Sequence, residues 1–459
     1  MAHLTRVAPP EFGRSSAPPA TTIEEYEARL AATVERMAQE GLDVLVVYAD
    51  REHFSDMAHL CGVDPRFEEG VLVLGRDGSR VIYLGNECQD YGPPPELGIA
   101  QRLYQEFSPQ GQIRDRPVQL GDVWAEVGIG PGTVVGTAGG KYFDPRYVPQ
   151  PRTAHSLPAY LVDALRDRAG ADNVVNAERI FLDPETGLRM TASAREIAQC
   201  EYAASVTSDS VRAALAALAP GVRADVLADR FEHRGLPFSA HAMVNFGDKV
   251  RRGLSSPTAQ TAELGAPYQI ALGLRGSLTC RSGAIARSRD DLAPEVADFF
   301  PELIANYFDT MVAWYRALRL GASTGEVFAA ADAARDPDVF SFALNPGHFL
   351  HTEEWSQSTF AAGADTALRS GMLLQGDIIP VVAGPFCAVN IEDGVALADE
   401  RLRADLQNDH PDVWDRMQRR RRFLAEEIGV ALDESVLPLS NMPLWHTPYA
   451  LDPDAVLVA

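Results

Sequence analysis

The stretch Gly371-Met-Leu-Leu-Gln-Gly-Asp377 decides the fold, together with Asn345-Pro-Gly-His348 before it and Asn390-Ile-Glu-Asp393 after it. Each segment contains a side chain that can bind a metal ion or transfer a proton. Neighbouring side chains of an extended strand point to opposite faces, so only one of Glu392 and Asp393 can enter a site. We expect Glu392 to point inward and Asp393 to make a structural hydrogen bond. These three segments therefore make His348, Asp377 and Glu392 the candidate site residues.

In their order and spacing these segments resemble the creatinase/aminopeptidase P/methionine aminopeptidase superfamily, whose C-terminal domain has the pita-bread fold. The resemblance implies two metal ions held by Asp, Asp, His, Glu and Glu, with the first two Asp eleven residues apart and the second three residues before an Arg. Counted back from Arg287, those positions hold Ala284 and Gly273, which cannot bind a metal. The chain therefore resembles a divergent member that lacks the two metal-binding Asp residues.

The remaining ligands are too few for a dinuclear centre. Divalent ions take about four to six ligands, and His348, Asp377 and Glu392 supply three side chains. Asp377 also stands where the superfamily has Glu, which is one methylene longer. We therefore expect no metal cofactor, with a single Mn, Zn or Fe ion on these three residues as the alternative. Creatinase works without metal on this fold, but the His segment it uses corresponds here to Ser255-Ser-Pro257, which argues against creatinase activity itself.

A second group of polar residues follows His348 closely. His351 with Glu353 or Glu354 could act as a general base near neutral pH, and the alternative is a surface-exposed polar turn. His241 is a further candidate base. The predicted catalytic residues are His348, His351, Asp377 and Glu392.

Arginines gather around the altered segment, at Arg251, Arg252, Arg275, Arg281 and Arg287. An Arg can neutralise buried carboxylates or bind a substrate carboxylate with two parallel hydrogen bonds. We expect Arg281 to occupy part of the lost metal site, although surface exposure is the alternative for each single Arg. By the same resemblance, Arg66 and Phe67 would contact the active site of the partner in a homodimer. The predicted substrate-binding residues are Arg252, Arg281, Glu354, Arg66 and Phe67.

The pattern along the chain predicts two α/β domains after a flexible arm at 1–20 that is rich in Pro, Ser and Ala. A capped helix start at Thr22, buried strands and a hairpin over 70–84 indicate a creatinase-like N-terminal α/β domain at 21–187. A second capped start at Ser193 opens the pita-bread domain at 188–459, which ends in a charged helical tail from Arg401 to Glu427. We expect Arg419 to Arg422 to form a solvated helix face or subunit contact, with a phosphate-binding patch as the alternative.

Composition limits the partners of the chain. The 41 Lys and Arg residues against 64 Asp and Glu residues give a formal net charge of −23, which disfavours nucleic acid and anionic membranes as partners. Five scattered cysteines without a CxxC pair favour a reducing cytoplasm. We expect no secretory signal and no membrane span. The glycine-rich segment 136–142 lacks the spacing of a P-loop.

These observations favour a hydrolase that cleaves a C–N bond of a small carboxylate-bearing substrate, metal-independent or atypically metallated. One alternative is an Xaa-Pro-type aminopeptidase with one metal, acting on short peptides. The other is a non-catalytic module that holds a peptide or small ligand in the old cleft. The sequence does not identify the substrate.

Overall fold

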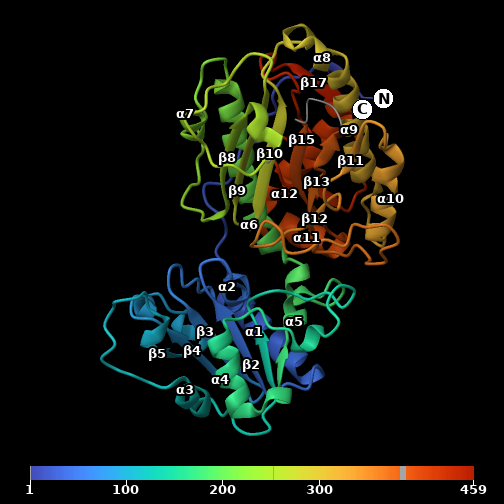
Figure 1. Ribbon diagram of the computed structural model, residues 1–459. Coiled ribbons are helices and arrows are strands. Elements are labelled where there is room, and N and C mark those ends of the chain that lie inside the picture. The colour runs from blue at the N-terminus through green and yellow to red at the C-terminus, as the bar shows by residue number, and fades with distance from the viewer. Residues whose placement is uncertain (1, 252, 383–388) are drawn as a thin grey trace. The chain divides into compact units, whose positions relative to one another are not determined.

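The structure, a computed structural model, describes residues 2–251, 253–382 and 389–459 (Figure 1). Its described residues form two compact units. One unit is Ala20–Met190, and the other combines the chain up to Pro19 with Thr191–Ala459. The division lies after Met190, and the sequence predicts a boundary after position 187. Among the described residues, no helix is both long and apolar enough to cross a bilayer.

The flexible arm predicted for residues 1–20 is wrong. Strand β1 (His3–Arg6) pairs antiparallel with β17 (Ala455–Val458) at the other end of the chain. Farther along, the ring of Phe12 packs edge-on against Phe423, with ring centroids 5.8 Å apart. These partners lie more than 400 residues away, so no local periodicity in the arm could reveal them.

The unit Ala20–Met190 is built on a mixed sheet in the order β5-β4-β3-β2-β6-β7. Strands β2 to β4 form an antiparallel meander, whereas β5, β6 and β7 add in parallel. The strands are β2 (Val44–Ala49), β3 (Gly70–Gly75), β4 (Arg80–Leu84), β5 (Ala100–Leu103), β6 (Val135–Ala138) and β7 (Val174–Asn176). The helices are α1 (Ile23–Gln39), α2 (Ser55–Cys61), α3 (Leu120–Glu126), α4 (Ala159–Ala169) and α5 (Arg179–Leu182).

Local sequence signals explain the elements of this unit. Thr22 caps α1 through the backbone of Glu25, whose side chain accepts from the backbone of Thr22, so the predicted helix start is confirmed. Strand β2 is buried along its whole length, as its continuous apolar run predicts. The predicted hairpin is also confirmed as β3 and β4. Trp124 and Leu161 close the core on one face of this sheet.

The second unit is built on an antiparallel sheet in the order β12-β13-β15-β10-β9-β8, with β16 also paired to β15. Its strands are β8 (Phe238–Phe246), β9 (Pro267–Leu274), β10 (Ser277–Ala284), β12 (His348–Phe349), β13 (Leu373–Asp377), β15 (Asn390–Leu397) and β16 (Val436–Pro438), with β11 (Phe340–Phe342) and β14 (Pro380–Val382) as a separate pair. Its helices are α6 (Ala194–Ala217), α7 (Ala224–Ala228), α8 (Pro294–Ala297), α9 (Phe299–Ala317), α10 (Thr324–Ala334), α11 (Glu400–Asp409) and α12 (Pro411–Phe423).

The long helices of this unit support the sheet. Ser193 and Glu196 form the predicted capping box of α6, most of whose residues are buried. Helix α9 supplies buried aromatic side chains to the strands: the Tyr307 hydroxyl donates to the carbonyl of Ile378 and accepts from the backbone N–H of Ile391. The strands that bear the candidate site are therefore held from behind by a rigid aromatic layer.

The basic run in the tail is not a solvated face throughout. Arg420 is fully buried and donates to Glu201 at 2.6 Å, and Arg416 donates to the same carboxylate at 2.8 Å. Arg421 donates to backbone carbonyls, whereas Arg419 pairs with Asp415 at 2.9 Å. Since a buried guanidinium needs a partner, this network pins α12 to α6. The expectation of a solvated face fails for Arg420 because its partner lies on a distant helix.

Candidate active site

Three neighbouring strands bring the site residues to one face of the sheet. Asp377 of β13 and Cys280 of β10 are both Cα partners of Glu392 in β15. Directly opposed residues of paired strands point to the same face, so the two carboxylates and the thiol share it. Asp393, the next residue, points to the opposite face and accepts a hydrogen bond from Arg281. The predicted orientations of Glu392 and Asp393 therefore agree with the structure.

His348 joins this face from β12, where it pairs with Gln375, two residues before Asp377. The preceding Gly347 has φ +98°, and a Cβ there would lie 2.7 Å from the Trp314 ring. Only glycine fits so close to an indole in this backbone conformation. The Trp314 N–H also donates to the carbonyl of Pro346 at 2.7 Å. The Pro-Gly-His segment thus fixes the histidine by packing its backbone against α9.

The imidazole of His348 is fully buried and surrounded by acidic groups. Its Nε2 lies 3.1 Å from Glu354 Oε1 and 3.8 Å from Asp377 Oδ2. Its ring stacks on Trp355, with centroids 4.1 Å apart and an interplanar angle of 23°. Burial alone would lower the pKa of His348, but the carboxylates of Glu354 and Asp377 outweigh it and raise the pKa. The site therefore favours the imidazolium form.

The two strand carboxyls are also perturbed. Burial, with repulsion from Glu354, raises the pKa of Asp377 to about 6, although His348 opposes the shift. Burial and then repulsion from Asp377 and Glu354 raise the pKa of Glu392 well above its usual value. The amide of Asn390 donates to Glu392 Oε1 at 2.9 Å and orients it. Carboxyls whose pKa values are raised above their usual range beside a histidine can exchange protons with a bound molecule.

On the side of β10 and β9, the residues next to Glu392 are neutral. Cys280 pairs with Glu392 on one side and with Ala271 of β9 on the other. Cys280 and Ala271 pack with Met243 and Leu278 in a small buried cluster. The pKa of the Cys280 thiol is raised well above its usual value by burial and by the nearby Glu392 and Asp377 carboxylates, so the thiol stays neutral.

The positions counted back from Arg287 are not the ones that face Glu392. Ala284 lies four residues past Cys280 and pairs with Pro267, and its N–H donates to the carbonyl of Pro448. Gly273 is packed so closely that a Cβ would lie 2.8 Å from Ser239 Oγ. Across β10 and β9, the row of paired residues that starts at Glu392 continues through Cys280 and Ala271. Neither Cys280 nor Ala271 is a carboxylate.

The prediction that Arg281 occupies part of a metal site is wrong. Arg281 is fully buried, and strand alternation points it away from Glu392's side chain. Its guanidinium donates to Asp393 at 2.7 Å and to the backbone carbonyls of Trp445, Cys280, Glu392 and Met442. Its donors are thus committed to protein groups, and Arg281 ties β10 to the final segment of the chain.

The expected pairing of His351 with Glu354 is wrong, and its pairing with Glu353 stays a prediction. Glu354 turns to His348, whereas His351 Nε2 lies 3.4 Å from Glu196 of α6. The two histidines do not share a helical face, because β12 is extended. His241 is exposed, and its Nε2 lies 2.7 Å from the carbonyl oxygen of Leu254. Among the predicted residues, His348, Glu354, Asp377 and Glu392 come together.

The remaining predicted substrate-binding residues lie elsewhere. Arg66 and Phe67 belong to the unit Ala20–Met190, where Arg66 has a positive φ of 61° and pairs with Asp64 at 3.4 Å. The Phe67 side chain is 60% exposed, which suits a residue that contacts another molecule. Arg252 falls outside the described residues.

Sequence reasoning missed three residues that shape the site. Trp355 covers the imidazole, Asn390 orients Glu392, and Cys280 faces Glu392. Asn390 carried a signal, since in a strand it shares a face with the residue two positions later. Trp355 and Cys280 gave none, because a stacking partner and a strand register are set by tertiary structure.

The kinds of ligand atom in the site suit a single divalent ion, but the distances between these atoms do not. One imidazole and three carboxylates suit a borderline metal such as zinc or manganese, and Asp377 Oδ1 has no hydrogen-bond partner among the described residues. Within the described residues, however, no three of these four side chains place ligand atoms all within 4.8 Å of one another. Ligand atoms of a tetrahedral zinc site lie about 3–4 Å apart, since each bond is about 2 Å long. The side chains are arranged as an ion pair and not as a coordination shell.

Comparisons with solved structures identify the fold. The chain is similar to a dipeptidase, PepE, from Mycobacterium ulcerans, with 21% identity and a TM-score of 0.62 over 84% of this chain and 95% of that one. It is also similar to a prolidase from Thermococcus sibiricus, with 15% identity and a TM-score of 0.65 over 83% and 96%. A variant of Escherichia coli aminopeptidase P in complex with substrate matches with 16% identity and a TM-score of 0.58 over 83% and 94%.

No protein-family model matches the chain, and no curated protein matches it in sequence. The likeness is therefore one of structure. The chain has the fold of these peptidases, in which an N-terminal domain precedes a C-terminal pita-bread domain, and the predicted fold class is confirmed.

Proposed function

We propose that the chain is a hydrolase that cleaves a C–N bond of a small carboxylate-bearing substrate, without a metal ion. The observation that carries the proposal is the buried His348–Glu354 pair, 3.1 Å apart, beside two carboxyls with raised pKa values. Buried titratable groups whose pKa values are shifted by specific neighbours are typical of acid–base sites. The fold shared with dipeptidases and prolidases supports a hydrolase.

The residues divide into an acid and a base. The imidazolium of His348 would donate a proton to the leaving nitrogen. The ionised carboxylate of Asp377 or Glu392 would accept a proton from the attacking water, whose oxygen bonds to the substrate carbon as the C–N bond breaks. A carboxylate with a raised pKa is the stronger base for this step. Glu354 holds His348 in its charged form.

The substrate carboxylate needs a cation, and Arg281 is fully engaged by protein groups. In this proposal the chain forms a homodimer in which Arg66 and Phe67 of a second copy reach the substrate. Arg66 forms an ion pair with Asp64 at 3.4 Å, and half of its side chain is exposed. A guanidinium held this loosely retains donors for a carboxylate.

The second candidate is an Xaa-Pro peptidase with one divalent ion on His348, Asp377 and Glu392. The buried Asp377 Oδ1, which finds no hydrogen-bond donor in the described part of the chain, favours it, since such an atom normally has a donor or a cation. The ion would act as a Lewis acid and activate water.

A substrate screen with and without chelator separates the two candidates. Purified protein is assayed against N-acyl and guanidino acids and against dipeptides with Pro in second position, while elemental mass spectrometry measures its metal content. Turnover that persists after chelation and is lost in His348→Ala supports the first candidate. Turnover of Xaa-Pro dipeptides that needs a stoichiometric metal supports the second. Unchanged turnover in His348→Ala contradicts both, and His241→Gln, at an exposed histidine, is the control.

A further inference from the structure

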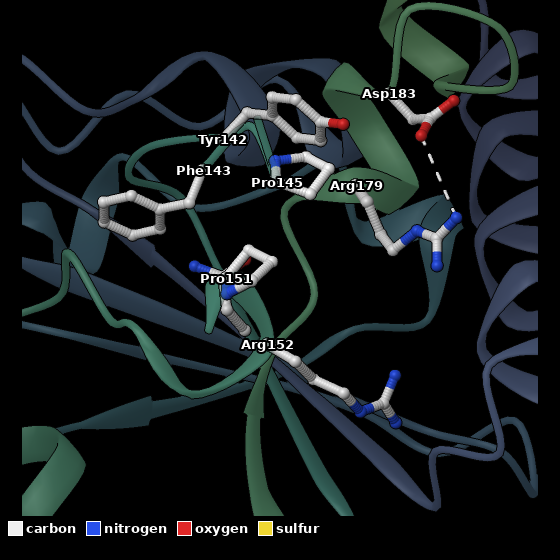
Figure 2. A pocket seen from close by; sticks show the side chains of 8 residues that line it. Tyr142, Phe143, Pro145, Pro151, Arg152, Arg179 and Asp183 are labelled. Atoms are coloured by element: carbon white, nitrogen blue, oxygen red, sulfur yellow. Dashed lines mark ion pairs between the residues drawn. The ribbon is translucent and has the colours of Figure 1, made fainter. Parts of the chain in front are cut away.

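A pocket lies within the unit Ala20–Met190, between the loop that follows β6 and the segment formed by β7 and α5 (Figure 2). Its volume is about 260 Å³. It is lined by Tyr142, Phe143, Pro145, Pro151, Arg152, Asn176, Arg179 and Asp183. None of these residues belongs to the candidate active site, so the pocket needs its own explanation.

The loop that forms one wall is anchored at its start. The buried Glu178 carboxylate accepts hydrogen bonds from the backbone N–H groups of Gly139 and Gly140, at 2.9 and 3.0 Å. Gly139 has φ +100°, and a Cβ there would overlap the carbonyl oxygen of Tyr48. The amides of this glycine-rich segment are thus occupied by a protein carboxylate. Ser156 Oγ accepts from the N–H of Lys141 and fixes the next residue.

The loop is also braced at its tip, where Asp144 accepts from the guanidinium of Arg146 at 2.9 Å and from its backbone N–H at 2.8 Å. A wall held in this way exists before any ligand arrives. Preformed pockets bind small molecules without an ordering cost to the protein.

One side of the pocket is apolar and flat. Figure 2 shows the ring of Tyr142 beside Pro145, and Pro151 also lines the pocket. Burial, and then the nearby carboxylate of Asp183, raises the pKa of Tyr142, so its ring stays uncharged. Aromatic and proline rings present flat faces on which a second ring can lie.

The other side carries two arginines whose charges are only loosely satisfied. Nη1 of Arg152 lies 3.5 Å from Glu40 Oε2, and Nη1 of Arg179 lies 3.5 Å from Glu40 Oε1. Arg179 also lies 3.8 Å from Asp183, the contact drawn in Figure 2. Charge-assisted hydrogen bonds between guanidinium and carboxylate are about 2.7–2.9 Å long. Arg152 also donates to the carbonyl of Glu40 at 3.5 Å. All these contacts are long, so the two half-exposed guanidiniums keep N–H donors for a ligand.

We propose that this pocket binds a small organic anion, a carboxylate or phosphate monoester on an aromatic ring. Its anionic group contacts Arg152 and Arg179, and its ring lies against Tyr142, Pro145 and Pro151. Glu40 competes with the ligand for the same guanidiniums. The site is independent of the function proposed above, because no residue is shared.

The proposal is tested by titrating the full chain with phenylacetate, phenyl phosphate and the neutral phenylacetamide at low salt, followed by ligand-observed NMR and calorimetry. We expect at least one anion to bind about tenfold more tightly than the amide, since hydrogen bonds to charged groups are worth about 1.5–3 kcal/mol. The tighter of the two anions identifies the natural anionic group. Added salt weakens this binding because the guanidiniums are half exposed.

Variants separate the anion site from a merely apolar crevice. Arg152→Gln and Arg179→Gln are each expected to weaken anion binding about tenfold. Arg166→Gln, a surface arginine 3.9 Å from Asp163 and outside the pocket, leaves it unchanged. Glu40→Gln removes the competing carboxylate and tightens binding, which no loss of folding could mimic. Equal affinity for anion and amide, unchanged binding in both arginine variants, or no binding of either anion at millimolar concentration would overturn the proposal.

Discussion

Cys280 and Glu392 are Cα partners on β10 and β15, so a neutral thiol faces a buried carboxylate across the candidate site. On its other side Cys280 pairs with Ala271, which adds only a methyl group. The half of the site formed by β9 and β10 thus lacks carboxyl groups, whereas the other half carries Asp377 and Glu392. This asymmetry leads to the first prediction.

Cys280→Asp should create a site for a divalent metal ion next to Glu392, where the wild-type chain has groups that exchange protons. A third carboxylate beside Glu392 raises repulsion, so the variant loses stability in chelator. Zinc or manganese restores that stability, by about 2.7 kcal/mol at a metal concentration one hundred times the Kd. Thermal unfolding with and without metal measures the effect. The matched control is Ala284→Asp, at the position counted from Arg287, where metal gives no such recovery; recovery there instead would favour the counted register.

Glu354→Gln should lower the pKa of His348. The variant removes the nearest carboxylate, so burial, which disfavours the imidazolium, then dominates. NMR titration of the imidazole signals measures the shift, with His241 as an exposed internal reference. If His348 is the general acid, turnover of a substrate found in the screen falls about 100- to 10,000-fold in His348→Gln. A pKa for His348 that does not change in Glu354→Gln would contradict the assigned ion pair.

Arg281→Met should unfold the second unit more easily and should not act through ligand binding. The change leaves the Asp393 carboxylate buried without its guanidinium, at a cost of about 3–5 kcal/mol. Chemical denaturation measures the loss. Arg287→Met is the control, because that arginine is 65% exposed in its pair with Asp291 and its loss should change stability far less. Normal stability of Arg281→Met with weakened ligand binding would revive a direct role for Arg281.

Glu178→Gln should gain stability over the wild-type chain as the pH rises. Burial and the neighbouring Asp56 carboxylate, which is ion-paired with Arg189 at 2.8 Å, raise the pKa of Glu178 well above its usual 4.5. The folded chain therefore retains a proton that the unfolded chain releases. The contribution of Glu178 to wild-type stability is fully present below pH 4.5 and declines as the pH rises toward the folded-state pKa. Glutamine mimics the protonated form and removes the decline.

Denaturation at several pH values measures the difference in unfolding free energy between Glu178→Gln and the wild type. The difference is small at low pH and grows between pH 4.5 and neutrality. Glu126→Gln, at a half-exposed ion pair with Arg102, serves as the control for a surface carboxylate. A difference that stays constant across this range would show that Glu178 does not hold its proton in the folded chain.

The sequence predicts the fold well where the information is local. The capping residues Thr22 and Ser193, the buried run of β2 and the hairpin of β3 and β4 all follow from neighbouring residues. The match to dipeptidase and prolidase structures confirms the fold class. His348, Asp377 and Glu392 also gather on one face, as strand alternation and their order in the chain suggest.

The failed predictions concern pairings across long sequence distances. Counting residues back from Arg287 puts Arg281 in the metal site, but its partners Asp393 and Trp445 lie 112 and 164 residues away in the sequence. Glu354 pairs with His348 and not with His351, because the strand after Gly347 is extended and the chain then turns back. The spacing of residues along the sequence determines neither the register of a hairpin nor the direction that a loop takes.

The pairing of β1 with β17 has a consequence for the order in which the chain is made. A polypeptide leaves the ribosome with its N-terminus first, so β1 emerges before the unit Ala20–Met190 and β17 emerges after it. The inserted unit has all of its strands early and can fold while synthesis continues. The unit that bears the candidate site must wait for its last strand, and β1 remains without its partner until translation reaches Val458.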